Sequence, residues 1–391
     1  MMNKHPHKLV RITTIPASMQ VLLRGQLRFM QSKGFEVHAV SADGKEVEAL
    51  KIQEGVPHTV VPFTRVISPL QDLKCLIRLT RYLRKIKPQI VHTHTPKAGL
   101  IGMWAALLAG VPVRLHTIAG LPWMETSGAM RWLLKNIERL TAWPATRVYP
   151  NSHKQLEYLR QNHIAGKKFK VLGNGSSNGI DTRVFSKNEE QRTLAQQLRI
   201  NENVQPGAWV WIFIGRIVKD KGMEELLQAW KKIHAAYPED RLWLLGLEER
   251  ALDPLSETAL AEMESNPSVK RWGFVQDVRP YLAASEVLVF PSYREGFPNV
   301  PMQAGAMECA LILSDINGCN EIVEHNVSGM LVPPKNEPAL YEAMKDIRLH
   351  PLKRDTLASA ARKRIAEGFD QQQLWNKLLD EYSECLKIKN I

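Results

Sequence analysis

Short apolar runs alternate with longer amphipathic segments along the whole chain. The runs are rich in Val, Ile and Leu, as expected for strands of a parallel sheet that is covered on both faces. Helical periodicity fills the intervals, for example over Met223–His234, Pro338–Ile347 and Gln371–Ile388. The predicted strands are Leu9–Ile15, Glu36–Ser41, Ile90–Thr93, Val113–Thr117, Arg147–Asn151, Trp209–Gly215, Arg241–Gly246, Val287–Pro291, Ala310–Ser314 and Gly329–Val332.

This alternation occurs twice, which predicts an α/β fold of two Rossmann-like, doubly wound domains. The length of 391 residues agrees, because a single core stops growing at about 250–300 residues. A Gly/Ser/Asn-rich stretch and a polar helix mark the joint. We therefore assign residues 1–183 to an N-terminal domain, 184–370 to a second domain, and 371–391 to a C-terminal helix that can pack back on the first. Two such domains facing each other predict a ligand cleft between them.

The basic charge of the chain lies in its N-terminal half. The formal net charge is +12, but residues 1–185 hold 27 Lys and Arg against 10 Asp and Glu, so the remainder is net acidic. Such a surplus suits nucleic acid, an anionic membrane or an acidic substrate. No helix-turn-helix, RRM or zinc-finger pattern accompanies it, which disfavours nucleic acid.

Cysteine usage and hydropathy predict a cytoplasmic protein that is soluble or peripheral to a membrane. Four scattered cysteines with no CxxC pattern favour neither a disulfide scaffold nor a structural metal. The first residues lack the apolar region of a signal peptide. The longest uncharged run, Ala98–Val113, is shorter than the roughly 20 residues of a membrane span and predicts a buried helix.

Two strand–loop–helix segments carry candidate anion-binding chemistry. In Phe213–Gly222, Gly215 allows close approach of the backbone, and Arg216 and Lys221 bracket a loop where two cations can hold a diphosphate. A solvated basic loop is the alternative. In Pro291–Ala304, a Gly/Pro loop enters a helix whose first amides can bind phosphate.

Glu295 precedes that second helix, where it can accept hydrogen bonds from ligand hydroxyls or simply cap the helix. Gln303 follows eight residues later, on the helix.

Together these segments resemble the retaining glycosyltransferases of the GT4 family (glycosyl transferases group 1), which have the GT-B fold. The resemblance rests on GRIVKDKG, SYREGFPNVP and DINGCNE, and it covers nearly the whole chain. VHTHTPKAGLIG, AGLPWMET and LGNGSSNGID look most like capsule and O-antigen transferases that extend undecaprenyl-diphosphate-linked sugars.

The resemblance implies roles for individual residues. Arg216 and Lys221 match the pair that stabilises the leaving nucleoside diphosphate. Glu295 matches the first Glu of a Glu-x7-Glu motif, which binds hydroxyls of the donor sugar. The resemblance implies that all three residues are catalytic. The second Glu is replaced by Gln303, which can still accept one hydrogen bond from a ribose. The remaining residues of the implied donor site are Gly215, Phe274, Gly296, Phe297, Pro298, Asn299 and Val300.

Candidates on the acceptor side come from the first domain. Many relatives place a His directly before a Gly at a strand end, whereas here Ala119 precedes Gly120. His94 and His116 are therefore weaker catalytic candidates than Glu295, Arg216 and Lys221. For His116, a position in the core is the alternative. His94, Gly120 and Lys97 are candidates for acceptor binding, with Lys97 as a clamp for a diphosphate or as a surface lysine.

The resemblance also implies that no cofactor or metal is needed. The chain contains no Asp-x-Asp, the motif with which the other large glycosyltransferase fold holds a divalent ion, so Arg and Lys are expected to carry the charge. No protein nucleophile is evident, and in such enzymes the donor phosphate is thought to take the proton of the acceptor hydroxyl.

An amphipathic helix over residues 70–87 can meet a membrane. Leu73, Leu76, Ile77, Leu83 and Ile86 form the predicted apolar stripe, opposite six Lys and Arg. The basic face can lie against anionic lipid or simply face solvent.

The resulting expectation is a retaining, metal-independent transferase that uses a nucleotide-diphosphate sugar, UDP being favoured. It moves a hexose or N-acetylhexosamine to a polyprenyl-diphosphate-linked saccharide at the inner face of the cell membrane. The alternatives are the same chemistry on a soluble acceptor, or a non-catalytic protein that binds nucleotide sugars.

Overall fold

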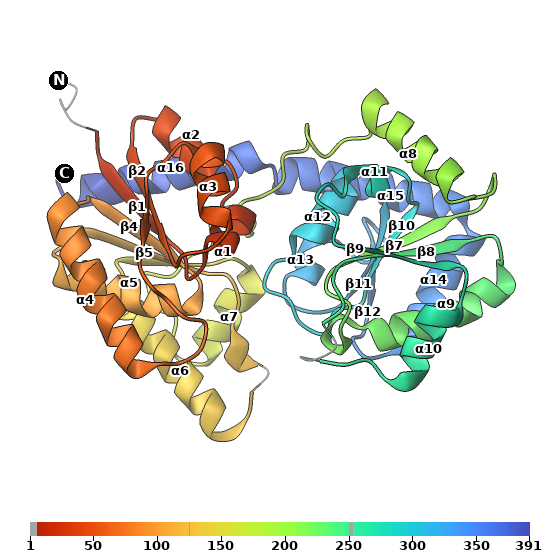
Figure 1. Ribbon diagram of the computed structural model, residues 1–391, viewed down its shortest axis with the longest axis horizontal. Helices are drawn as coiled ribbons and strands as arrows, with labels where there is room; N and C mark the ends of the chain where they lie inside the picture. Colours follow the sequence, from red (N-terminus) through yellow and green to blue (C-terminus); the bar gives the residue numbers. More distant parts are fainter. Residues whose placement is uncertain (1–5, 125, 250–252) are drawn as a thin grey trace. The chain divides into compact units, whose positions relative to one another are not determined.

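The computed structural model describes residues 6–124, 126–249 and 253–391, which form two compact units (Figure 1). The first unit runs to Asn178 and also includes Gln372–Ile391, and the second is Gly179–Gln371. This division lies five residues before the predicted boundary at 183. The reason is backbone pairing, because the Ile180 N–H donates to the Phe369 carbonyl and the Gln371 N–H donates to the Ile180 carbonyl.

Each unit contains one six-stranded, fully parallel sheet. The strand order is β3-β2-β1-β4-β5-β6 in the first unit and β12-β11-β10-β7-β8-β9 in the second, so each sheet has the Rossmann order. The first sheet consists of β1 (Lys8–Ile12), β2 (Glu36–Ser41), β3 (His58–Val60), β4 (Ile90–His94), β5 (Val113–Ile118) and β6 (Arg147–Pro150). The second consists of β7 (Val210–Ile214), β8 (Arg241–Leu245), β9 (Val269–Gly273), β10 (Val287–Phe290), β11 (Ala310–Ser314) and β12 (Met330–Val332).

Helices cover both faces of the first sheet. On one face lie α4 (Pro69–Ile86), α5 (Pro96–Leu108), α6 (Gly128–Ala142) and α7 (His153–Gln161), with α5 in contact with both α4 and α6. On the other lie α1 (Pro16–Leu22), α2 (Gln26–Ser32), α3 (Glu46–Glu54) and α16 (Gln371–Ile388) (Figure 1). Tyr382 and Leu386 of α16 belong to the core on this face. A short 3-10 turn, η1, spans Pro122–Met124.

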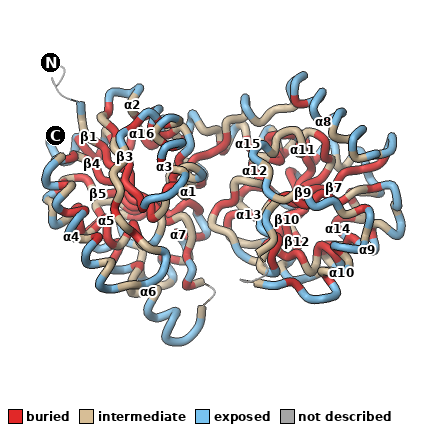
Figure 2. Tube along the Cα trace, viewed as in Figure 1, coloured by how far each residue is buried: buried red, intermediate tan, exposed pale blue. Residues whose placement is uncertain are grey.

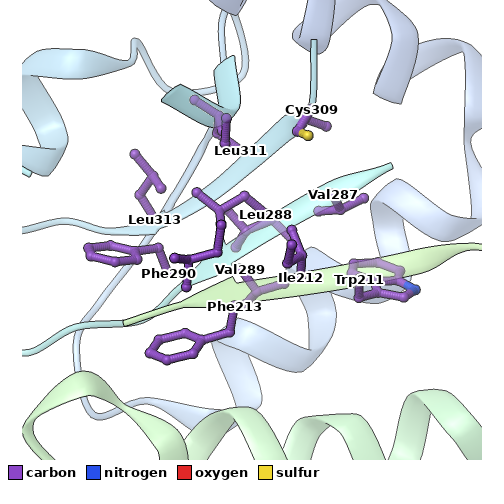
Figure 3. Close-up of a cluster of buried hydrophobic side chains, with 14 of the residues drawn as sticks. Trp211, Ile212, Phe213, Val287, Leu288, Val289, Phe290, Cys309, Leu311 and Leu313 are labelled. Carbon is purple, nitrogen blue, oxygen red and sulfur yellow. The ribbon is translucent and has the colours of Figure 1, made fainter. Parts of the chain in front are cut away.

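The second unit has a single core built mainly from its sheet. Trp211 and Phe213 of β7, Val289 of β10 and Leu311 of β11 lie together in it (Figure 3). Its helices are α8 (Glu189–Asn201), η2 (Lys219–Lys221), α9 (Met223–Ala236), α10 (Glu257–Ser265), α11 (Arg279–Ala283), α12 (Asn299–Ala306), α13 (Cys319–Ile322), α14 (Glu337–Leu349) and α15 (Pro351–Gly368).

All ten predicted strands are present, but two further strands were not predicted. The additional strands are β3 and β9, and each lies at an edge of its sheet. β3 has only three residues, and β9 exposes Lys270 and Arg271, so neither shows the apolar run on which the prediction rested. Edge strands often carry such charges, which block pairing with another chain.

The helix predicted over residues 70–87 forms as α4, but its apolar stripe was partly wrong. Cys75, Leu79 and Leu83 face the core, whereas Leu73 and Ile77 are 53% and 44% exposed. Many residues along α4 and α6 are exposed to solvent (Figure 2). None of the helices in the described part of the chain is long and apolar enough to cross a membrane, and α5 is the predicted buried helix.

Candidate functional site

In the second unit, the strand order reverses between β7 and β10, and the loops after these two strands touch. The N–H of Tyr293 donates to the Asp220 carbonyl at 2.9 Å. Gly222 has a φ of +72°, and a Cβ there would lie 2.1 Å from the Pro291 carbonyl oxygen, so only glycine fits. The carboxyl edge at such a switch point is where open α/β sheets bind ligands.

Lys221 and Glu295 come together at this switch point. The Lys221 ammonium lies 2.7 Å from the Glu295 carboxylate and 3.5 Å from the Ser292 hydroxyl. Both charged side chains are largely buried, with 15% and 16% exposed. A cation for a phosphate and a carboxylate for hydroxyl groups thus stand side by side, although they are 74 residues apart in the sequence.

Arg216 lies at the end of β7 and is more exposed. Its guanidinium pairs with Glu249 at 2.8 Å and lies 3.9 Å from Asp220. Asp220 also accepts from Arg294, at 2.9 Å. Asp220, Glu249, Arg294 and Ser292 were not predicted as site residues. The only sequence signal for Arg294 was its position beside Glu295, and the acids could be recognised only from their contacts.

The loop before α12 is closely packed. The Asn317 amide donates to the Gly296 carbonyl at 3.1 Å, and a Cβ on Gly318 would lie 2.2 Å from that same oxygen. Phe297 is buried and packs against Phe369. After Pro298, α12 begins at Asn299, so the amides of Asn299 and Val300 belong to the first turn, whose N–H groups have no acceptor within the helix.

The other predicted donor residues occupy separate positions in the second unit. A Cβ on Gly246 would lie 1.8 Å from the Gly215 carbonyl oxygen, so the backbones after β7 and β8 approach closely. Gln303 lies half-buried on α12. Phe274 follows β9, two strands away from β7, and its side chain is 73% exposed.

Cys319 lies near the Lys221–Glu295 pair but does not provide a thiolate. Burial and the neighbouring Glu295 charge raise the pKa of the Cys319 thiol well above its usual value. The thiol therefore remains protonated at neutral pH, and a protonated thiol is a poor nucleophile.

In the first unit, His94 belongs to a buried polar cluster. Arg11 is fully buried and donates to His94 Nε2 at 2.7 Å, to the Gln26 amide oxygen at 2.5 Å and to the Tyr382 hydroxyl at 2.9 Å. His92 stacks on His94 with ring centroids 4.5 Å apart. Burial and the Arg11 charge hold the pKa of His94 well below its usual value, so its ring is neutral. The contact with Arg11 occupies the only free lone pair of that ring.

His116 points to the opposite face of the same sheet. Its Nδ1 lies 2.8 Å from the Thr93 hydroxyl, and its ring packs so tightly on α5 that a Cβ on Gly99 would approach it to 2.4 Å. Burial lowers the pKa of His116 to about 4. His94 and His116 therefore cannot face one common substrate from this sheet.

Lys97 opens α5 and is already paired in this structure. Its ammonium donates to Asp72 at 2.7 Å, to the Thr64 hydroxyl at 3.1 Å and to the Val66 carbonyl. Because all three N–H donors have acceptors, Lys97 would have to exchange one of them to bind a phosphate. Gly120 lies half-buried after β5.

Among the residues that the structure describes, no three His, Cys, Asp or Glu side chains are grouped so that they could hold a metal ion. The four cysteines are free and buried.

Two Rossmann-like units in one chain, with a charged site at the switch point of the second, are typical of glycosyltransferases of the GT-B class. Comparison with known proteins supports this class. The family "Glycosyl transferases group 1" matches residues 208–348, and the "Glycosyl transferase 4-like domain" matches residues 19–175. The chain belongs to this glycosyltransferase family and is a glycosyltransferase.

Two relatives illustrate the range of similarity. The capsular polysaccharide biosynthesis glycosyltransferase CapM of Staphylococcus aureus is 32% identical over 97% of this chain and 98% of its own length. An Escherichia coli enzyme, UDP-Gal:alpha-D-GlcNAc-diphosphoundecaprenol alpha-1,3-galactosyltransferase, is 26% identical over 83% of each chain. Among solved structures, Anabaena HepE in complex with UDP and glucose shares the fold, with a TM-score of 0.80, 18% identity and coverage of 97% of this chain and all of its own.

Proposed function

We propose that this glycosyltransferase moves a hexose or N-acetylhexosamine, with retention of configuration, from a UDP-sugar to a polyprenyl-diphosphate-linked saccharide in surface polysaccharide biosynthesis. The observation that carries the proposal is the Lys221–Glu295 pair at the switch point of the second unit. A sugar nucleotide needs a cation for its diphosphate and, on the sugar attached to it, an acceptor for hydroxyl groups, and this pair offers both. The names of the Staphylococcus aureus and Escherichia coli relatives support the polysaccharide pathway, the UDP donor and the lipid-linked acceptor.

In the proposed reaction, the bond between the anomeric carbon and the diphosphate oxygen breaks, and a bond from that carbon to the acceptor hydroxyl oxygen forms on the same face. The proton of the hydroxyl passes to the departing diphosphate. Arg216 and Lys221 stabilise the negative charge that develops on the diphosphate. The amides of Asn299 and Val300 add dipolar stabilisation at the start of α12. Because the cations supply this charge, we propose that no divalent metal is required.

Arg216→Ala and Lys221→Ala test the donor assignment. Each variant loses a charge-assisted bond, so we expect turnover or donor affinity to fall about 10- to 150-fold. Turnover is measured as sugar transfer, and donor affinity by the thermal shift that UDP-sugars cause. A chelator in the transfer assay tests metal independence, and the anomeric configuration of the product, determined by NMR, tests retention. Lys219→Ala, an exposed lysine two residues from Lys221, is the matched control and should behave as wild type. Undiminished transfer by the double variant would show that the diphosphate binds elsewhere.

We further propose that the first unit lies on an anionic membrane through its α4–α6 surface. This surface consists of the exposed apolar residues Leu73, Ile77, Met130, Trp132 and Leu133 and the exposed basic residues Arg78, Arg81, Arg131 and Arg139. Exposed tryptophan beside basic residues is typical of helices that lie at a lipid interface. The enzyme would then act at the inner face of the cell membrane.

Sedimentation with anionic liposomes at low salt tests this surface. We expect Arg78→Glu/Arg81→Glu to lose most binding, since each basic residue near the surface contributes about 1 kcal/mol. The control, Lys231→Glu/Lys363→Glu, makes the same charge change on exposed residues of the second unit. Equal sedimentation of the two double variants would exclude a specific role for this surface.

A further inference from the structure

The first unit has a cavity of about 390 Å³ at its own switch point. The strand order reverses between β1 and β4, and the cavity lies where these strands end, beside Thr14 and Thr95. The two threonine hydroxyls are hydrogen-bonded at 2.8 Å, and Thr95 holds a φ of +71°, which is costly for a β-branched residue. The cavity is therefore built at the edge where such sheets bind ligands, and its volume is typical of small-molecule sites.

The wall of this cavity is apolar. It is formed by Ile15, Ile67, Leu100, Ile101, Leu134 and Ile137, from the loops after β1 and β3 and from helices α5 and α6. By contrast, a cavity of about 700 Å³ in the second unit is lined by charged residues, among them Lys187, Glu286, Arg354 and Asp355. The two cavities therefore differ in the chemistry of their linings.

The charged groups around the apolar cavity leave one cation at its mouth. Lys97 and Asp72 neutralise each other across 2.7 Å. Arg65 is exposed, and no ion pair joins it to another of the described residues. An apolar interior with a cation at its mouth is complementary to an amphiphile whose hydrocarbon chain carries an anionic head.

We propose that this cavity binds the first isoprenoid units of the acceptor lipid, with its diphosphate near Arg65. The inference rests on the proposed function, because it assumes a lipid diphosphate acceptor. In addition, the enzyme binds the hydrocarbon chain directly, and this binding is separate from any enrichment of the lipid at a membrane surface. The chain, and not only the saccharide, then contributes to acceptor selection.

The test compares acceptors that share one diphosphate-linked saccharide but carry isoprenoid chains of increasing length, in detergent and without liposomes. Each methylene buried in an apolar site raises affinity about fourfold, so one additional buried isoprenoid unit should lower the wild-type KM at least about tenfold. Ile137→Trp fills the cavity and should bring the ratio of short-chain KM to long-chain KM towards one. Leu140→Trp is the matched control on the same helix, since Leu140 is exposed and does not line the cavity; it should keep the wild-type ratio.

A second variant guards against a folding defect. Ile67 is 63% exposed, so Ile67→Asp places a carboxylate in the cavity without disturbing the core, and it should also remove the chain-length preference. A wild-type KM that does not change with chain length, or a preference that survives both variants, would overturn the inference. Failure of wild-type enzyme to transfer sugar to any lipid diphosphate acceptor would instead overturn the proposed function.

Discussion

The two switch points have the same topology and opposite chemistry. At the β7/β10 edge, Arg216, Lys221 and Glu295 bring charge to the ends of the strands, each with an oppositely charged partner. At the β1/β4 edge, the corresponding space is an apolar cavity whose only internal ion pair among the described residues is that of Lys97 with Asp72. The strand order therefore determines where a ligand can bind, and the residues of the following loops and helices determine its chemistry.

Close backbone packing holds the loops of the charged edge together. Gly222→Ala should disrupt this packing, and we expect it to have a larger effect on stability than the other substitutions. The added Cβ would lie 2.1 Å from the Pro291 carbonyl oxygen, so the two loops must separate. We expect a loss of at least about 3 kcal/mol in the free energy of unfolding and no thermal shift with UDP-sugars.

Gly207→Ala is the matched control for this variant. Gly207 also has a positive φ, of +83°, but nothing lies within 4 Å of its added Cβ, so only about 1–2 kcal/mol should be lost. Thermal unfolding with and without UDP-sugar measures both effects. Similar losses in the two variants would mean that the contact between the loops does not hold the site.

The apolar edge has a different weak point, a buried carboxyl on α6 that has an unpaired oxygen, and Glu138→Gln should have a smaller effect there. Glu138 is buried, its Oε1 has no hydrogen-bond partner among the described residues, and burial raises its pKa to about 7. A raised pKa means that the folded protein holds the proton more tightly than the unfolded chain. Stability from this group is therefore complete below about pH 4.5 and falls as the pH rises to about 7.

Replacing Glu138 with neutral Gln should remove this pH dependence. We expect the variant to gain roughly 2–3 kcal/mol over wild type near pH 8 and little near pH 5, measured by denaturant unfolding. Glu157→Gln on α7 changes an exposed carboxyl and should show no such difference. A gain for Glu138→Gln that is equal at both pH values would show that the carboxyl is ionised in the folded protein throughout this range.

Much of the fold could be predicted because most strands are apolar and continuous. The strands on which the candidate sites depend, β1, β4, β7 and β10, were all predicted from such runs. β3 and β9 were missed because they are edge strands, and an edge strand can be short or charged. Leu73 and Ile77 were assigned to the apolar stripe of α4 but are exposed, because helical spacing alone cannot tell which apolar residues face the core.

The candidate donor residues could be located in the sequence, but their contacts could not. The position of Lys221 after one strand and Glu295 after another predicts a common edge, whereas their 2.7 Å pairing depends on the Rossmann strand order. Arg11 was overlooked, although a charge between Val10 and Ile12 in an apolar strand indicates a buried group with partners. One of those partners, Tyr382, is 371 residues away and could not be inferred.

Taken by itself, the sequence determined that the chain forms two α/β units and that cations and a carboxylate follow the strands of the second, because strand period and loop composition are local properties. Only the tertiary structure decided that His94 and His116 face opposite sides of one sheet, that Lys97 is paired, and that an apolar cavity lies at the first switch point. These features arise from contacts between distant segments, and no local pattern encodes which segments will meet.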